Sequence, residues 1–174
     1  MRIARKFKNQ VFPWMVLIML SMSACMETPK IEEISEEEDK QPLLDFDKES
    51  LVFHLNQLRI KGCQCGEEEM PPVSPLKWNS LLSIAAQKHA EDMHENNFFD
   101  HVGSDLSTVD VRVSNAGFPW KLVGENIARG NFTEESIIEA WKGSPTHCVQ
   151  LMHADFLVVG VGKKENFWTM VLAR

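Results

Sequence analysis

The chain has 174 residues, of which 25 are acidic and 18 are basic, and its formal net charge is -7. An acidic protein lacks the positive surface that nucleic-acid phosphates attract, so we exclude DNA and RNA as partners. The length is enough for one domain with its own core, and the sequence has neither an internal repeat nor an interior linker rich in glycine and serine. We expect one folded domain in a monomer.

The first 24 residues have the pattern of a secretory signal. Four basic residues and no acid precede an apolar run, Val11–Leu20, which is too short to span a bilayer comfortably and is interrupted by Pro13. The ending Ser23-Ala24-Cys25 resembles a bacterial lipobox, with Met22 where leucine is more usual. By that resemblance Cys25 would be acylated, for example with palmitate, and become the mature N-terminus. An ordinary signal peptide cut nearby and an uncleaved anchor are the alternatives. Two or three acyl chains would hold the protein at a membrane surface, because each buried methylene contributes about 0.8 kcal/mol.

Residues 25–46 are expected to form a disordered acidic tether. Between Glu27 and Lys40 the sequence has seven acids and two lysines, with few apolar residues to bury. Such a segment cannot offset the entropy of ordering its chain, and its like charges extend it. Removal of residues 1–24, which hold four basic residues and no acid, would take the formal charge from -7 to -11.

The predicted domain is 47–174, and its larger part has helical patterns. Apolar spacing and capping residues predict five helices, over 48–61, 79–96, 108–116 and 133–141 and from Ser144 onward. Gly62 ends the first of them, and Asn79 and Thr133 are good N-caps. Pro145 takes the first position of the last helix, where a missing N–H costs nothing.

The end of the chain changes to the period of β-strands. Phe156–Gly162 and Asn166–Ala173 are rich in β-branched and aromatic residues, and a polar turn over 163–165 joins them. The side chains on both sides of each strand are apolar, and strands buried on both faces need helices above and below. We therefore predict an α+β fold, an α-β-α sandwich with a central antiparallel sheet flanked by helices.

Three short segments, far apart in the chain, each offer a His or Glu that can titrate or bind a metal near neutral pH. They are Phe99-Asp100-His101, Gly124-Glu125-Asn126-Ile127 and the stretch from Trp141 to Cys148. In this order they resemble the CAP domain of cysteine-rich secretory proteins, insect venom antigens and plant pathogenesis-related proteins, which has many bacterial relatives. The resemblance spans nearly the whole domain and implies the CAP fold. It also gives Asn56 and Arg59 a structural role in the first helix.

The resemblance implies a central cleft lined by His101, Glu125 and His147, with Ser144 and Asn126 beside them. In CAP domains the two histidines can hold a divalent metal such as Zn, so His101 and His147 are candidate metal ligands and Glu125 is the candidate catalytic base. His147 would lie at the third position of its helix, where the helix dipole favours the neutral imidazole that a metal needs. Many eukaryotic relatives have a second Glu near the place of Ser144, which leaves hydrolysis here without a base other than Glu125. A structural hydrogen-bonded cluster and adventitious metal binding are the alternatives.

Three cysteines, Cys63, Cys65 and Cys148, remain when the lipidation candidate Cys25 is set aside. Bacterial CAP domains often have one cysteine after the first helix and another directly after the second histidine, so the resemblance implies a disulfide between Cys65 and Cys148. Cys63 would be a free thiol or would replace Cys65 in the bridge. A bridge that closes a loop of about 80 residues would contribute a few kcal/mol if it is unstrained.

The function that we predict is binding without turnover, by a lipid-anchored extracytoplasmic lipoprotein of the cell membrane or an outer membrane. Its partner could be a small apolar ligand, a cell-envelope component or a protein, and Trp78, Trp120 and Trp168 could supply apolar contact area. The rival hypothesis is a divalent-metal-dependent hydrolase of peptidase type that uses the same cleft. A structural envelope adaptor is the third. Other enzyme motifs are missing, and His89, on an apolar helix face, is interpreted as a core histidine.

Overall fold

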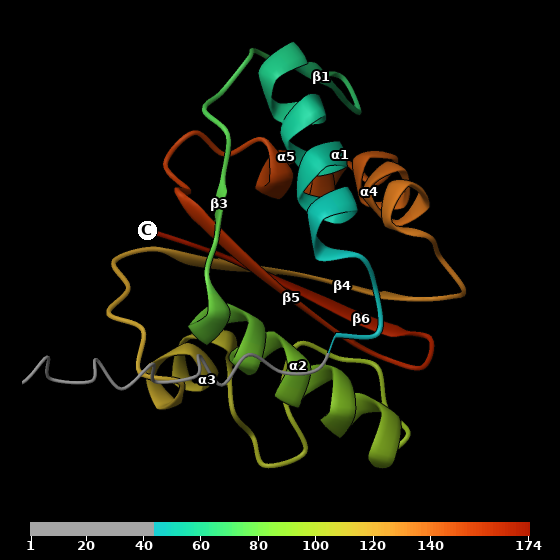
Figure 1. Cartoon of the computed structure of the whole chain (residues 1–174), viewed down its shortest axis with the longest axis vertical. Helices are drawn as coiled ribbons and strands as arrows, with labels where there is room; N and C mark the ends of the chain where they lie inside the picture. The colour runs from blue at the N-terminus through green and yellow to red at the C-terminus, as the bar shows by residue number, and fades with distance from the viewer. Residues whose placement is uncertain (1–43) are drawn as a thin grey trace, which may run out of the picture. The chain divides into compact units, whose positions relative to one another are not determined.

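The structure is a computed structural model that describes residues 44–174 (Figure 1). The predicted signal segment with Cys25, and all of the predicted tether except residues 44–46, lie outside the described residues. The described elements are α1 (Lys48–Lys61), β1 (Cys63–Cys65), β2 (Glu68–Met70), β3 (Lys77–Trp78), α2 (Ser80–Glu95), α3 (Val109–Asn115), β4 (Val123–Arg129), α4 (Glu134–Lys142), α5 (Pro145–Leu151), β5 (Val158–Lys164) and β6 (Phe167–Ala173).

The five predicted helices are confirmed, with their ends shifted by one or two residues at most. The side chain of Asn79 accepts a hydrogen bond from the Leu82 N–H, and that of Thr133 accepts one from the Ser136 N–H, as predicted for N-caps. The Ser136 hydroxyl in turn accepts from the Thr133 N–H, which completes a capping box. Ser144 is the N-cap of α5 through its backbone, but its side chain makes no capping hydrogen bond. Its hydroxyl instead lies 3.4 Å from the Thr146 hydroxyl.

The central sheet has the strand order β3-β5-β6-β4. The predicted hairpin of β5 and β6 is confirmed, but its turn lies at 165–166, because Lys163 and Lys164 pair with β6 as part of β5. β4 pairs antiparallel with β6 along its whole length. The short β3 adds a parallel pair of two residues at the other edge, so the predicted antiparallel sheet is antiparallel everywhere except at this pair. Neither β3 nor β4 was predicted, since β4 carries Gly124, Glu125 and Asn126 at its centre and lacks an apolar strand pattern. A separate hairpin of β1 and β2 follows α1.

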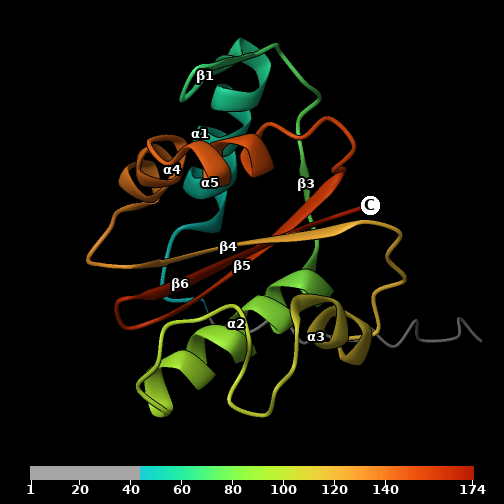
Figure 2. The ribbon, with the colours of Figure 1, turned by 180° about the vertical axis from the view of Figure 1, so that it is seen from behind.

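Helices cover both faces of this sheet, which confirms the α-β-α sandwich. In Figures 1 and 2, α1, α4 and α5 lie on one face and α2 and α3 on the other. The side chains of β6 alternate accordingly: Trp168, Met170 and Leu172 join the core under α1, α4 and α5, whereas Val171 packs against α2 and α3. Trp168 is 1% exposed, so the expectation that it offers contact area to a ligand was wrong.

Two polar side chains of α1 hold the loops around it. Arg59 is fully buried and donates hydrogen bonds to the carbonyl oxygens of Ser74 and Leu151. Asn56 pairs with both the N–H and the carbonyl of Leu76. These contacts are those of structural residues, as the resemblance implied. Among the described residues no helix is both long enough and apolar enough to cross a membrane.

Candidate functional site

Glu125 lies at the centre of the candidate site, in the middle of the edge strand β4. It is 5% exposed, and a buried carboxylate needs compensating partners. Arg112 Nη2 donates to Glu125 Oε2 at 2.6 Å, and His101 Nδ1 lies 2.8 Å from Oε1. Both carboxylate oxygens are therefore engaged by neighbouring side chains.

His101 is carried by the loop between α2 and α3, and its side chain is 54% exposed. The hydrogen bond to Glu125 raises the pKa of His101, although partial burial opposes the shift. Arg112 Nη2 also donates to the backbone carbonyl of His101 at 3.1 Å. One guanidinium thus fixes both the carboxylate and the loop, and it leaves the Nε2 atom of His101 available for a ligand.

Arg112 and His89 are the site residues that sequence reasoning missed. Arg112 is 9% exposed on α3. The signal for it was indirect, because a Glu in the middle of a buried strand requires a cation nearby. His89 is 1% exposed on α2, with Nε2 at 3.9 Å from Glu125 Oε1.

His89 has the environment of a core histidine, as interpreted from the sequence. Its Nε2 atom lies 2.9 Å from the carbonyl oxygen of Asp100, and burial lowers its pKa despite the nearby charge of Glu125. The neutral ring therefore donates from Nε2. Its Nδ1 atom is buried and has no hydrogen-bond partner among the described residues.

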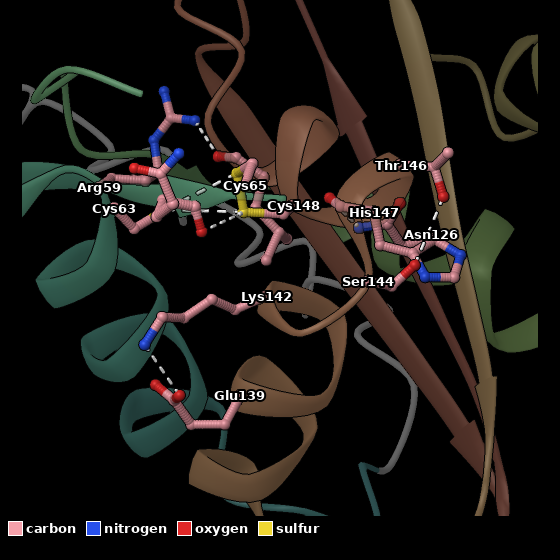
Figure 3. The surroundings of a disulfide bond; sticks show 12 residues. Arg59, Cys63, Cys65, Asn126, Glu139, Lys142, Ser144, Thr146, His147 and Cys148 are labelled. Atoms are coloured by element: carbon pink, nitrogen blue, oxygen red, sulfur yellow. Dashed lines mark hydrogen bonds and ion pairs between the residues drawn. A yellow bond between two sulfur atoms is a disulfide. The ribbon is translucent and has the colours of Figure 1, made fainter. Parts of the chain in front are cut away.

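His147 lies on α5, on the face of the sheet opposite to α2 and α3. It lies in the first turn of α5, and Asn126 Nδ2 donates to its backbone carbonyl at 3.1 Å, which ties the helix to the strand. Figure 3 shows His147, Asn126, Ser144 and Thr146 together beside β4. Burial, followed by the charge of His101, lowers the pKa of His147. Its ring is consequently neutral at physiological pH.

The alternation of the strand separates the predicted residues into two groups. Glu125 points toward α2 and α3 and forms the hydrogen bond with His101, whereas Asn126 points toward α5 and contacts His147. The structure therefore brings His101 and Glu125 together directly. No hydrogen bond among the described residues joins the His147 ring to either of them.

His101 and His147 are the two candidate ligands for a metal. The contact with Glu125 orients the His101 ring as carboxylates outside a metal's ligand shell commonly do, and His147 has the neutral ring that a metal requires. A catalytic zinc site normally has three protein ligands. Within residues 44–174, His101, Glu125 and His147 do not form a group whose ligand atoms all lie within 4.8 Å of one another. Three cysteines do form such a group: Cys63, Cys65 and Cys148.

A polar cavity of about 290 Å³ adjoins the site on the side of α2 and α3. The buried His89 and Arg112 line it, and the other lining side chains are Lys88, Asp92, Ser104, Asp105, Ser107 and Asn115. Asp92 organises this wall, because both of its oxygens accept hydrogen bonds from Ser104.

Exposed apolar side chains gather along the segment that carries His101 and Arg112. Of nine large apolar side chains exposed in the described chain, five fall between residues 99 and 120: Phe99, Val102, Leu106, Val111 and Trp120. Leu106 is 82% exposed and has a positive φ of 65°, which is uncommon for a leucine. Trp120 is exposed and can contact a ligand, as expected. Trp78, by contrast, is half-buried and packs against Phe46.

A disulfide fixes α5 against β1, on the side of the sheet that carries His147. The predicted bridge between Cys65 and Cys148 is present, and Cys63 has a free thiol (Figure 3). Because Cys148 directly follows His147, the bridge holds the backbone of this candidate ligand in place.

Comparison with known proteins agrees with the fold. The chain is 31% identical to the uncharacterized protein YkwD of Bacillus subtilis over 105 residues, 59% of this chain and 41% of the relative. It is 30% identical over 97 residues to the membrane protein YlbC of the same organism, 56% of this chain and 28% of the relative. The chain thus spans less than half the length of these curated relatives.

Solved structures give the same result. An extracellular protein with an SCP domain from Bacillus anthracis superposes with a TM-score of 0.57 and 29% identity, over 59% of this chain and 34% of that one. An outer surface protein from Borrelia burgdorferi superposes with a TM-score of 0.61 and 21% identity, over 73% of this chain and 93% of that one. The family model described as the cysteine-rich secretory protein family, CAP, matches residues 52–171. The chain therefore belongs to the CAP family.

Proposed function

We propose that this chain is an extracytoplasmic binding module, anchored to a membrane through an acylated Cys25, that holds its ligand on the His101 side of the CAP domain. The observation that carries this proposal is the engagement of Glu125. Its oxygens are held by Arg112 and His101, and the side chain is buried. A general base must reach a water or a substrate proton, so a carboxylate held in this way favours binding over hydrolysis.

The ligand that fits this surface combines an apolar part with a polar group. His101 offers its Nε2 atom, and Val102 and Leu106 are exposed in the same loop. An apolar small molecule or an apolar side chain of an envelope protein could cover these residues. The extracellular description of the Bacillus anthracis relative supports a location outside the cytoplasm.

The proposed binding is tested with an apolar fluorophore, 1-anilinonaphthalene-8-sulfonate, added to the folded protein. We expect the wild type to bind it and the Val102→Ser/Leu106→Ser variant to lose that binding. Ile60→Ser is the matched control, because Ile60 is exposed on α1, away from this loop. Equal fluorescence in the wild type and the loop variant would contradict the proposed surface.

The rival function, a metal-dependent hydrolase, rests on the orientation of His101 by Glu125. Zinc calorimetry on the oxidised protein separates the two functions. A metal site predicts a Kd of about 1 µM or tighter, lost in His101→Ala/His147→Ala and kept in the control variant His54→Ala/His94→Ala. Such a result would justify assays with peptide and ester substrates. No binding by the wild type would eliminate the metallohydrolase.

A further inference from the structure

Three sulfur atoms meet where β1 packs against α5. Cys63 and Cys65 are two residues apart on β1, so their side chains lie on the same side of the strand. Cys63 Sγ lies 3.8 Å from Cys65 Sγ and 3.6 Å from Cys148 Sγ, while Cys65 and Cys148 are bonded to each other. A free thiol thus lies in contact with both sulfurs of a disulfide (Figure 3).

The three cysteines differ in their access to solvent. Cys65 is 3% exposed and Cys148 is fully buried, so reagents in solution have little access to the bridge itself. Cys63 is half-buried and lines a cavity of about 240 Å³ between α1 and α4, together with Lys61 and Lys142. Burial raises the pKa of the Cys63 thiol, and the positive charge of Lys142 partly opposes that effect.

We propose that Cys63 and Cys65 exchange as the disulfide partner of Cys148, so that the oxidised protein interconverts between two bridged forms. The Cys63 thiolate attacks Cys148 Sγ, the Cys63–Cys148 bond forms and the Cys65–Cys148 bond breaks. Cys65 leaves with the electron pair and takes up the proton that Cys63 released. One thiol and one disulfide are present before and after the step, so it consumes neither an oxidant nor a reductant.

The geometry requires a small movement before the exchange. Cys63 Sγ is almost equally far from the two bonded sulfurs, so it lies beside the bond and not in line with it. Attack on a disulfide sulfur needs an approach along the bond, which rotation of the Cys63 side chain at the cavity can provide. The shape of β1 favours the product as well, since it presents both cysteines to the same position on α5.

The exchange would move the covalent attachment of α5 from Cys65 to Cys63. In the second form the bridge faces the cavity between α1 and α4, and the free thiol of Cys65 is buried. The turn after Cys65 packs on the start of α5, where a Cβ at Gly66 would meet Pro145 Cγ at 3.1 Å. Pro145 is two residues from His147, so the choice of partner acts on the helix that carries this candidate ligand.

The test is a peptide map of the free thiol in the full chain, with Cys25→Ser to remove the cysteine outside the cluster. The oxidised protein is incubated at about pH 8.5, near the ordinary pKa of a thiol. It is then unfolded in acidic urea with N-ethylmaleimide, because scarce thiolates stop further exchange there. We expect label on both Cys63 and Cys65, with the Cys65 share above about 1%, which is a hundredfold limit on the equilibrium constant.

Two variants control this experiment. Cys63→Ser must give no label on Cys65, since that variant has no thiol to attack the bridge. Cys65→Ser must form the Cys63–Cys148 bridge during oxidative folding, identified as a linked peptide pair. Label on Cys63 alone in the otherwise unchanged cluster, after prolonged incubation at that pH without any added thiol, would overturn the proposal even if Cys65→Ser fails to fold.

Discussion

At the scale of single residues, Arg112 has the largest number of roles in the site. It neutralises the buried Glu125, holds the carbonyl of His101 and donates to the carbonyl of Ser107 at 2.7 Å. The loop between α2 and α3 and the strand β4 therefore share one cation. An Arg is suited to this position, because its guanidinium has several donors in a fixed plane, which a lysine lacks.

Arg112→Met is expected to destabilise the protein by about 3–5 kcal/mol, because it leaves an uncompensated buried carboxylate. Replacing both partners, in Arg112→Met/Glu125→Leu, removes that charge and should recover most of the loss. Urea unfolding of the wild type, both single variants and the double variant measures the coupling. Additive losses in the double variant would contradict a direct ion pair between these residues.

His101 gives the site a pH dependence that can be measured separately. Its pKa is raised above the ordinary value of 6.5 by Glu125, so the protonated ring stabilises the folded state at lower pH. This contribution is fully present below about pH 6.5 and disappears as the pH rises through the raised value. In urea unfolding, the decrease in midpoint from the wild type to His101→Gln should therefore be larger at about pH 5.5 than at about pH 8.5. An equal loss at both pH values would contradict it.

At the scale of elements, the close contact between α2 and β5 fixes the floor of the site. Gly160 and Gly162 let the helix backbone approach the strand, and the Ser83 hydroxyl donates to the carbonyl of Val161 at 2.8 Å. This contact sets the distance between α2 and the sheet. It thereby brings His89 of α2 close to Glu125 of β4, with 3.9 Å between Nε2 and Oε1.

Gly160→Ala tests that contact. A Cβ there would lie 2.2 Å from the backbone nitrogen of Ser83, so the helix has to move, and we expect a loss of about 1–3 kcal/mol or more. Gly143→Ala is the control, because its Cβ would meet no atom closer than 3.4 Å and its φ is -67°. Thermal unfolding of the two variants should separate them clearly, and similar midpoints would argue against close packing at Gly160.

At the scale of the whole domain, one bridge links β1, which follows α1, to α5 across 83 residues. Such a long loop is costly to close in the unfolded chain, so the bridge contributes to stability mainly by restricting that state. It also keeps α5, and with it His147, beside β4.

Cys148→Ser removes either form of the bridge and should cost about 2–5 kcal/mol in urea unfolding. Cys65→Ser should cost less, since Cys63 can take its place, and Cys63→Ser should leave the midpoint close to that of the wild type. If Cys65→Ser and Cys148→Ser were equally unstable, Cys63 would not serve as a substitute partner.

The sequence by itself determined the helices, the terminal hairpin and the family, because these depend on local patterns and on motif order. Asn79 and Thr133 are the N-caps of α2 and α4, as predicted. The apolar side chains of β6 pack into the cores on both faces of the sheet, as the strand pattern indicates. The tertiary structure decided what local patterns do not contain. β4 became a strand because β6 supplies its hydrogen bonds, although its centre is polar. Arg112 entered the site because Glu125, once buried, needs a charged partner from another element, and that requirement arises only when the chain is folded.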